Sequence, residues 1–160
     1  MKRYTLFVFA ALFALSMAAC KKAATAETGD AQTVGAADGT QLPLNLQGST
    51  LAWKGSKKMG DSHNGTISIT EGYLVAGGGA ISGGKFTIDM TSIKVLDLQG
   101  EMADKLAGHL RASDFFLADS FPTAVFEISN VTAAATDSTT HNITGNLTLR
   151  GVTKSVTFPA

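Results

Sequence analysis

The chain has 160 residues with 13 basic and 13 acidic side chains, so it lacks the positive charge that nucleic-acid-binding proteins carry, and no nucleic-acid partner is expected. Its only cysteine is Cys20, which excludes a disulfide framework and a thiolate metal cluster. Stability must therefore come from apolar burial within one domain of ordinary size.

The first residues, 1–19, have the pattern of a lipoprotein signal peptide. Lys2 and Arg3 precede an apolar run, YTLFVFAALFALSM, that is too short to span a bilayer comfortably. Two alanines stand directly before Cys20, and this arrangement resembles a lipobox. The resemblance implies cleavage before Cys20 and a lipid anchor on that residue. The alternative is an ordinary secretory signal in which Cys20 is incidental.

Residues 20–48 are expected to form a flexible tether that holds the folded domain away from a membrane. The stretch is rich in Ala, Thr, Gly and Gln and contains almost no aliphatic side chains before Leu42. Such a composition buries too little apolar surface to offset the entropy of ordering. One exception is LPLNL (42–46), a candidate docking strand that Pro43 would confine to a sheet edge.

From residue 49 onward, apolar and polar residues alternate in short runs that predict antiparallel strands. The runs are STLAWKGS, GTISIT, YLVA, GKFTIDMTSI, TAVFEIS, HNITGNLTL and TKSVTFP. The best of them place these residues on one face: Phe86, Ile88, Met90, Phe126, Ile128, Leu147 and Leu149. Strands with a single apolar face suit either a sandwich or an up-and-down barrel, and periodicity alone does not choose between them.

One helix is expected to interrupt the strands, in GEMADKLAGHLRA (100–112). Met102, Leu106, His109 and Leu110 fall at helical spacing and would form its apolar side. Acidic residues cluster near its start, where the helix dipole favours them. The helix makes the predicted fold an all-β array with a single helical excursion.

Catalytic and metal-binding residues are not expected. His63, His109 and His141 lie far apart, with no close-spaced second ligand. The chain has no GxSxG nucleophile elbow, and the Gly-rich VAGGGAISGG is flanked by strands, so hairpin turns explain it better than phosphate binding. We therefore expect no enzyme.

Three segments carry a resemblance to a known family. GGKFTIDMTSI, GHLRASDFFLADSFPTAVFEI and ITGNLTLRGVTKSVTFP have the order and spacing of the YceI-like domain family, and the resemblance covers residues 49–160. The upstream SHNGTISI resembles the version found in lipoproteins of the Bacteroidetes type. The resemblance implies a lipocalin-like antiparallel β-barrel whose apolar interior takes up a polyisoprenoid or similar lipid. It also implies export to the periplasm or envelope, with no established catalytic activity and no cofactor.

This resemblance makes the seven inward residues the expected lining of a lipid site. A barrel of about eight strands holds one slender ligand or is filled by its own side chains. Phe115 and Phe116, which follow the helix, are expected to form a lid, one of them touching a bound tail. The alternative is a dry core, in which case the domain is a lipid-anchored protein-interaction or structural module.

Barrel closure is a separate question. Family members generally continue for several strands after the GVTKSVTFP segment, whereas six or seven strands are counted here. Either the sequence is a fragment, or its open edge pairs with a partner such as a second copy in a homodimer. The expected location is the cell envelope, facing the periplasm, and Lys21 after Cys20 favours the outer membrane.

Replacement of Cys20 tests the anchor. The Cys20→Ala protein should lose labelling by a fatty-acid probe and become soluble, because the modified thiol is gone. Metabolic labelling and membrane fractionation of the two proteins measure this. Unchanged membrane association of the variant would rule out the lipobox.

Overall fold

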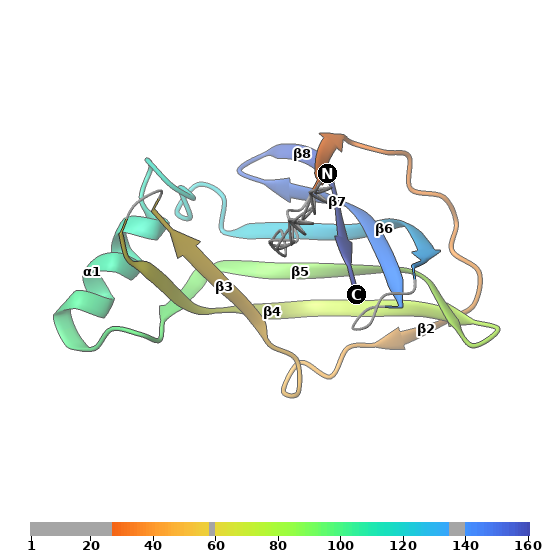
Figure 1. The fold of residues 1–160 in the computed structure, drawn as a ribbon, viewed down its shortest axis with the longest axis horizontal. Helices are drawn as coiled ribbons and strands as arrows, with labels where there is room; N and C mark the ends of the chain where they lie inside the picture. The colour runs from red at the N-terminus through yellow and green to blue at the C-terminus, as the bar shows by residue number, and fades with distance from the viewer. Residues whose placement is uncertain (1–26, 58–59, 135–139) are drawn as a thin grey trace, which may run out of the picture.

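The computed structural model describes residues 27–57, 60–134 and 140–160, so the expected signal peptide and Cys20 lie outside the described residues. The described part contains eight strands and one helix (Figure 1). They are β1 (Glu27–Asp30), β2 (Thr40–Pro43), β3 (Leu51–Ser56), β4 (Ser62–Gly77), β5 (Ala80–Val95), α1 (Gly100–Arg111), β6 (Thr123–Ala133), β7 (His141–Leu149) and β8 (Val152–Pro159).

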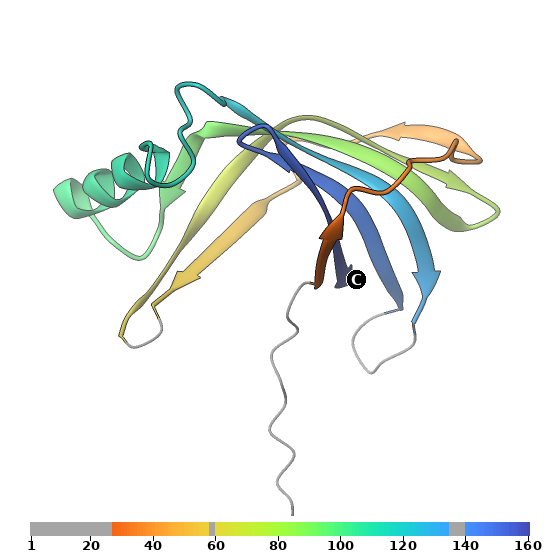
Figure 2. The same cartoon turned by 90° about the horizontal axis from the view of Figure 1, so that it is seen from above.

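The strands form one antiparallel sheet in the order β1-β8-β7-β6-β5-β4-β2, and β3 also pairs with β4. Along the long strand β4, β3 covers Ser62–Ile67 and β2 covers Tyr73–Ala76. Within the described residues, these strands at one end of the sheet do not pair with β1 at the other, so the sheet is an open arch (Figure 2). The prediction of an all-β antiparallel fold with one inserted helix is confirmed, and the barrel it implied is not closed.

The stretch expected as a tether contributes two strands to this sheet. Glu27 to Asp30 pairs with Thr157 to Lys154, and Thr40 to Pro43 pairs with Ala76 to Tyr73. Both strands lie at sheet ends, and every described side chain of β2 is exposed. Backbone hydrogen bonds to an existing edge require no apolar side chains, which is why composition did not reveal β1. The candidate edge strand at 42–46 is confirmed in part, since Leu42 and Pro43 pair with β4.

Between these two strands, residues 31–39 cross the outer, convex face of the sheet. The backbone N–H of Gln32 donates to Asn146 Oδ1 (2.9 Å), and Asn146 Nδ2 donates to the Gln32 carbonyl (2.7 Å). Further on, Ser82 Oγ donates to the Asp38 carbonyl (2.7 Å). The crossing segment therefore connects both ends of the arch without covering its concave face.

Strand β4 unites two runs, GTISIT and YLVA, that sequence alternation separates. Register shifts against β5 fall between Thr66 and Ser68, between Ile69 and Glu71, and between Val75 and Ala76. A β-bulge adds one residue and so shifts the alternation of apolar and polar side chains by one position. The strand continues, with apolar side chains on the same face of the sheet, although the alternation in its sequence is interrupted. This difference arises because bulges carry no strong sequence signal.

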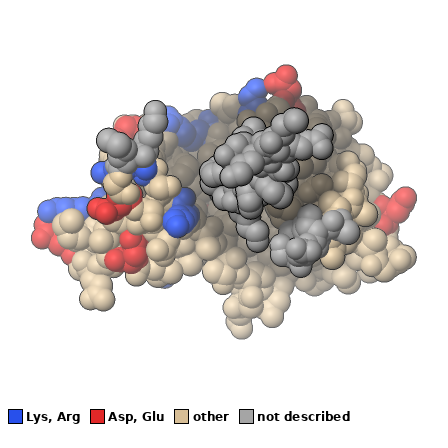
Figure 3. All heavy atoms as spheres, viewed as in Figure 1, with Lys and Arg blue, Asp and Glu red and all other residues tan. Residues whose placement is uncertain are grey.

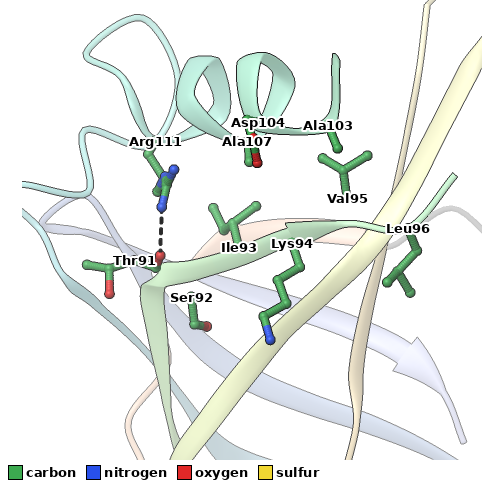
Figure 4. A pocket seen from close by; sticks show the side chains of 10 residues that line it. All are labelled: Thr91, Ser92, Ile93, Lys94, Val95, Leu96, Ala103, Asp104, Ala107 and Arg111. Atoms are coloured by element: carbon green, nitrogen blue, oxygen red, sulfur yellow. Dashed lines mark hydrogen bonds between the residues drawn. The ribbon is translucent and has the colours of Figure 1, made fainter. Parts of the chain in front are cut away.

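Helix α1 occupies the predicted residues, and its predicted apolar side is correct in part: Leu106 and Leu110 are half-buried, and Leu110 packs against buried core residues. Ala107 is buried and Ala103 half-buried, and both face Ile93 and Val95 of β5 (Figure 4). Met102, expected on the apolar side, is exposed. Small alanine side chains let the helix approach the strand closely. The helix therefore packs on its alanine side, although Met102 has the larger apolar side chain.

Two glycines give a matched test of the packing. A Cβ at Gly65 would run into the backbone carbonyl of Lys94 and the indole of Trp53, whereas a Cβ at Gly108 in α1 would meet nothing within 4 Å. Gly65→Ala should therefore destabilise the fold by about 2 kcal/mol or more, as overpacked sites do. Gly108→Ala should stabilise it by about 1 kcal/mol, since alanine is the better helix former. Urea unfolding followed by fluorescence of the single tryptophan measures both, and equal effects would contradict the described packing.

Candidate functional site

The concave face of the arch holds a cavity of about 570 Å³ that is lined by apolar residues alone. They come from β3 to β8 and are Leu51, Ile69, Leu74, Ile81, Phe86, Ile88, Phe126, Ile128, Ile143, Leu147, Val156 and Phe158. Figure 3 views the molecule from this side and shows a hollow, with most of the visible charged side chains gathered around α1. The volume lies within the range of small-molecule sites.

Five of the seven residues predicted as lining border this cavity, namely Phe86, Ile88, Phe126, Ile128 and Leu147. The other two do not. Met90 is buried in a core cluster with Ile93, Ala118 and Ala124, and Leu149 packs against that cluster. They lie on the same apolar face, at the end that α1 and the following turn cover, so alternation alone could not separate them from the lining.

Seven lining residues were absent from the predicted set: Leu51, Ile69, Leu74, Ile81, Ile143, Val156 and Phe158. Most of them alternate in phase within their own strands, which is the signal that could have found them. Assigning them to one cavity requires the register between strands. For example, β7 places Ile143 opposite Phe158, and β4 bulges bring Ile69 and Leu74 to one face.

Three aromatic rings belong to the lining. The rings of Phe86 and Phe126 stack with centroids 6.4 Å apart, and the Phe126 ring lies 5.7 Å from that of Phe158. A Cβ at Gly145 would collide with the Phe126 ring, so glycine makes room for it there. Gly145 is thus a site of close ring approach, and the register shift between β6 and β7 falls in β6, between Ile128 and Asn130.

The phenylalanine pair lies outside this cavity. Phe115 and Phe116, with ring centroids 6.4 Å apart, border a separate apolar pocket of about 200 Å³ near the helix, together with Trp53 and Leu110. Phe116 packs against the core cluster, whereas Phe115 is exposed. Neither lines the larger cavity, so the predicted lid over a bound tail has no counterpart there.

A third hollow, of about 340 Å³, is lined by residues of α1 and of the end of β5 (Figure 4). Arg111 Nη1 donates to the Thr91 carbonyl (3.2 Å) across it, and Ile93 faces Ala107. These contacts hold the helix on the sheet. Of the other polar residues in the lining, Lys94 points away from the helix (Figure 4).

The three histidines belong to three separate contacts. His63 Nδ1 lies 2.8 Å from Asp97 Oδ2, and His109 Nδ1 lies 3.4 Å from Asp114 Oδ2. His109 is exposed, although it was expected on the apolar side of the helix. Over residues 27–57, 60–134 and 140–160 there is no group of three or more side chains that could hold a metal ion.

The carboxylate of Asp97 joins β4 to the segment after β5. The backbone N–H of Asn64 donates to Asp97 Oδ1 (2.9 Å), and this bond, followed by the hydrogen bond from His63, holds the pKa of Asp97 below its ordinary value. At the opposite end of the sheet, the Lys154 ammonium beside Asp30 (2.8 Å) lowers the pKa of that carboxyl too. The Asp30 side chain is 97% exposed and the Asp97 side chain 26% exposed, and both contacts lie at strand ends, where ion pairs contribute little to stability.

The sequence matches a known protein family. The model of the YceI-like domain matches residues 43–160. The chain belongs to the YceI-like domain family. The YceI-like resemblance in the sequence is thereby confirmed. Among the described residues, moreover, the one helix is neither long nor apolar enough to traverse a membrane.

Curated relatives of this YceI-like chain are UPF0312 proteins. One from Pseudomonas aeruginosa is 43% identical over 76 residues, which cover 48% of this chain and 35% of the relative. Another from Azotobacter vinelandii is 46% identical over 52 residues, which cover 32% of this chain and 26% of the relative. The chain thus matches about a third or less of their length.

A solved structure of a mutant CJ YCEI protein with a monobromobimane guest structure is also similar. It aligns with a TM-score of 0.41 and 16% sequence identity, over 99% of this chain and 67% of that chain.

Acid titration tests the described contact of Asp97. A carboxylate whose pKa is lowered in the folded state stabilises the fold above its unfolded pKa of about 3.9, and the stabilisation is lost as pH falls through the folded-state pKa. In Asp97→Asn, the free energy of unfolding should therefore fall less steeply below about pH 4 than in the wild type. Urea unfolding at a series of acidic pH values measures the slopes, and identical slopes would contradict the contact.

Proposed function

We propose that this YceI-like domain binds a long apolar lipid, such as a polyisoprenoid, in the concave cavity. The observation that carries the proposal is a cavity of about 570 Å³ bordered by twelve apolar residues and no polar one. Neither a reaction nor polar recognition has residues to support it there. The role is that of a non-catalytic carrier or store.

Burial of hydrocarbon supplies the affinity. Each CH₂ group that leaves water gains about 0.8 kcal/mol, so a chain of several isoprene units needs no hydrogen bond to be retained. The aromatic rings of Phe86, Phe126 and Phe158 offer broad apolar contact along such a chain. Prenyl and acyl chains make the same kind of apolar contact with this surface. The site can therefore distinguish lipids only by the length and shape of their chains.

The open shape favours a ligand over a dry core. In a dry core the inward side chains of the arch would pack against each other, whereas here they surround open space. Ile81 and Phe158 line the cavity and are also exposed, at 38% and 37%. Contiguous exposed apolar surface of this kind marks a site for a ligand or partner.

The sequence supports the cellular setting of this function. Cys20 after a lipoprotein-like signal supports a diacylglyceryl anchor, and SHNGTISI supports a lipoprotein of the Bacteroidetes type. Lys21 favours the outer membrane. We therefore place the domain in the cell envelope, facing the periplasm, with no enzymatic activity and a membrane and an apolar lipid as its partners.

Two neighbouring positions on β7 test the cavity. Ile143 lines it, while Asn142 lies on the opposite face of the strand, so Ile143→Asp and Asn142→Asp place the same charge inside and outside. Ile143→Asp should lower lipid retention at least about tenfold, because a buried charge is costly without a partner. Mass spectrometry of organic extracts from the folded proteins measures retention.

Asn142→Asp should retain lipid like the wild type. Equal retention by both variants would place the lipid elsewhere. A wild-type protein that is repeatedly recovered without lipid, but with a bound protein partner, would favour the interaction module instead.

A further inference from the structure

The distance between the lipid-anchor residue and the folded domain is short. β1 begins at Glu27, which pairs with Thr157 of β8, so Cys20 is only seven residues from the sheet. Seven residues span at most about 25 Å when fully extended. The anchor therefore cannot lie far from the end of β8 at which β1 begins.

That end of β8 is also an end of the cavity. Phe158 follows Thr157 directly and pairs with Ile143, which in turn pairs with Val131 of β6. Ile81 lies at the start of β5, next to the β4–β5 turn, at the end of the sheet remote from α1 (Figure 1). We call the three cavity-lining residues at this end, Ile81, Ile143 and Phe158, the mouth.

The mouth is the exposed part of the lining. Ile81 and Phe158 are exposed, whereas Ile88 and Ile128, deeper in the cavity, retain only 9% and 4% exposure. The β4–β5 turn beside it contains three uncharged glycines, Gly77 to Gly79. The mouth thus combines exposed apolar side chains with an apolar cavity, and it lies near the residue that the proposed lipid would hold at a bilayer. These features are typical of a membrane-facing surface.

We propose that the mouth docks on the bilayer in which the Cys20 lipid is inserted. Ile81 and Phe158 contact the acyl region, and a lipid tail passes between that leaflet and the cavity without crossing water. This inference rests on the proposed anchor and on the cavity as the lipid site. It goes further by fixing which side of the domain faces the membrane and how close it lies.

Single cysteines at the two ends of the sheet test the orientation in the full-length, lipid-modified protein. Ala133→Cys lies in β6 two residues beyond Val131, near the mouth, and Gly108→Cys lies on α1 at the other end. Both positions are exposed. Because diacylglyceryl modification consumes the thiol of Cys20, the introduced cysteine alone reacts with a fluorophore.

The labelled proteins are reconstituted in phosphatidylcholine vesicles that contain a phospholipid with a nitroxide in its headgroup. Quenching should be several-fold stronger at position 133 than at position 108. Equal quenching, or stronger quenching at position 108, would overturn the docking. So would shielding of position 133 that grows with protein concentration without vesicles, since a second copy would then cover the mouth.

Two further measurements separate this inference from the proposed function. Intact-mass analysis shows whether Cys20 carries the lipid, and its absence would remove the short anchor and overturn the docking. An empty organic extract combined with strong quenching at position 133 would reject lipid carriage while supporting the docking. Recovery of lipid from the cavity, combined with equal quenching at positions 133 and 108, would support lipid carriage and reject the docking.

Discussion

A single layer of strands must keep one face apolar and then find something to cover it, and the structure of this domain follows from that requirement. At the end of the sheet where α1 packs on β5, Met90, Ile93 and Ala118 form a compact core. The large cavity lies beside this core on the concave face, and no described element covers it. The folded core and the proposed ligand site thus use neighbouring parts of one surface. The packed core holds the strands that line the cavity in place.

The sheet edges explain how the open arch keeps its shape. β1 and β2 pair with opposite ends of the sheet, and residues 31–39 between them cross the convex face, held by hydrogen bonds to Asn146 and Ser82. Because this connection runs behind the sheet, residues 31–39 do not cover the cavity on the concave side. β1, the first described strand, pairs with β8, so the proposed anchor and the cavity mouth share one end of the domain.

The sequence was informative where a signal is local and uninformative where it depends on pairing. Alternation predicted β7 and most of β5, and helical spacing predicted α1, because each pattern lies within one element. It failed at the bulges of β4, which change phase, and at β1, which is held by backbone bonds. It could not show that Ile88 borders the cavity as well as the core cluster, whereas Met90 lies in the core cluster alone. The exposed His109 shows the same limit, because apolar spacing cannot reveal which side of a helix finds a partner.

Photocrosslinking tests most directly the central claim that a lipid tail occupies the concave cavity. A polyisoprenoid with a photoreactive group along its tail is loaded into the full-length protein, and the labelled residues are identified by peptide mass spectrometry. The account predicts labelling of inward residues on neighbouring strands, with Phe86, Phe126 and Leu147 among them. Labelling confined to the pocket at Phe115 and Phe116, or to outward residues such as Thr148, would contradict it.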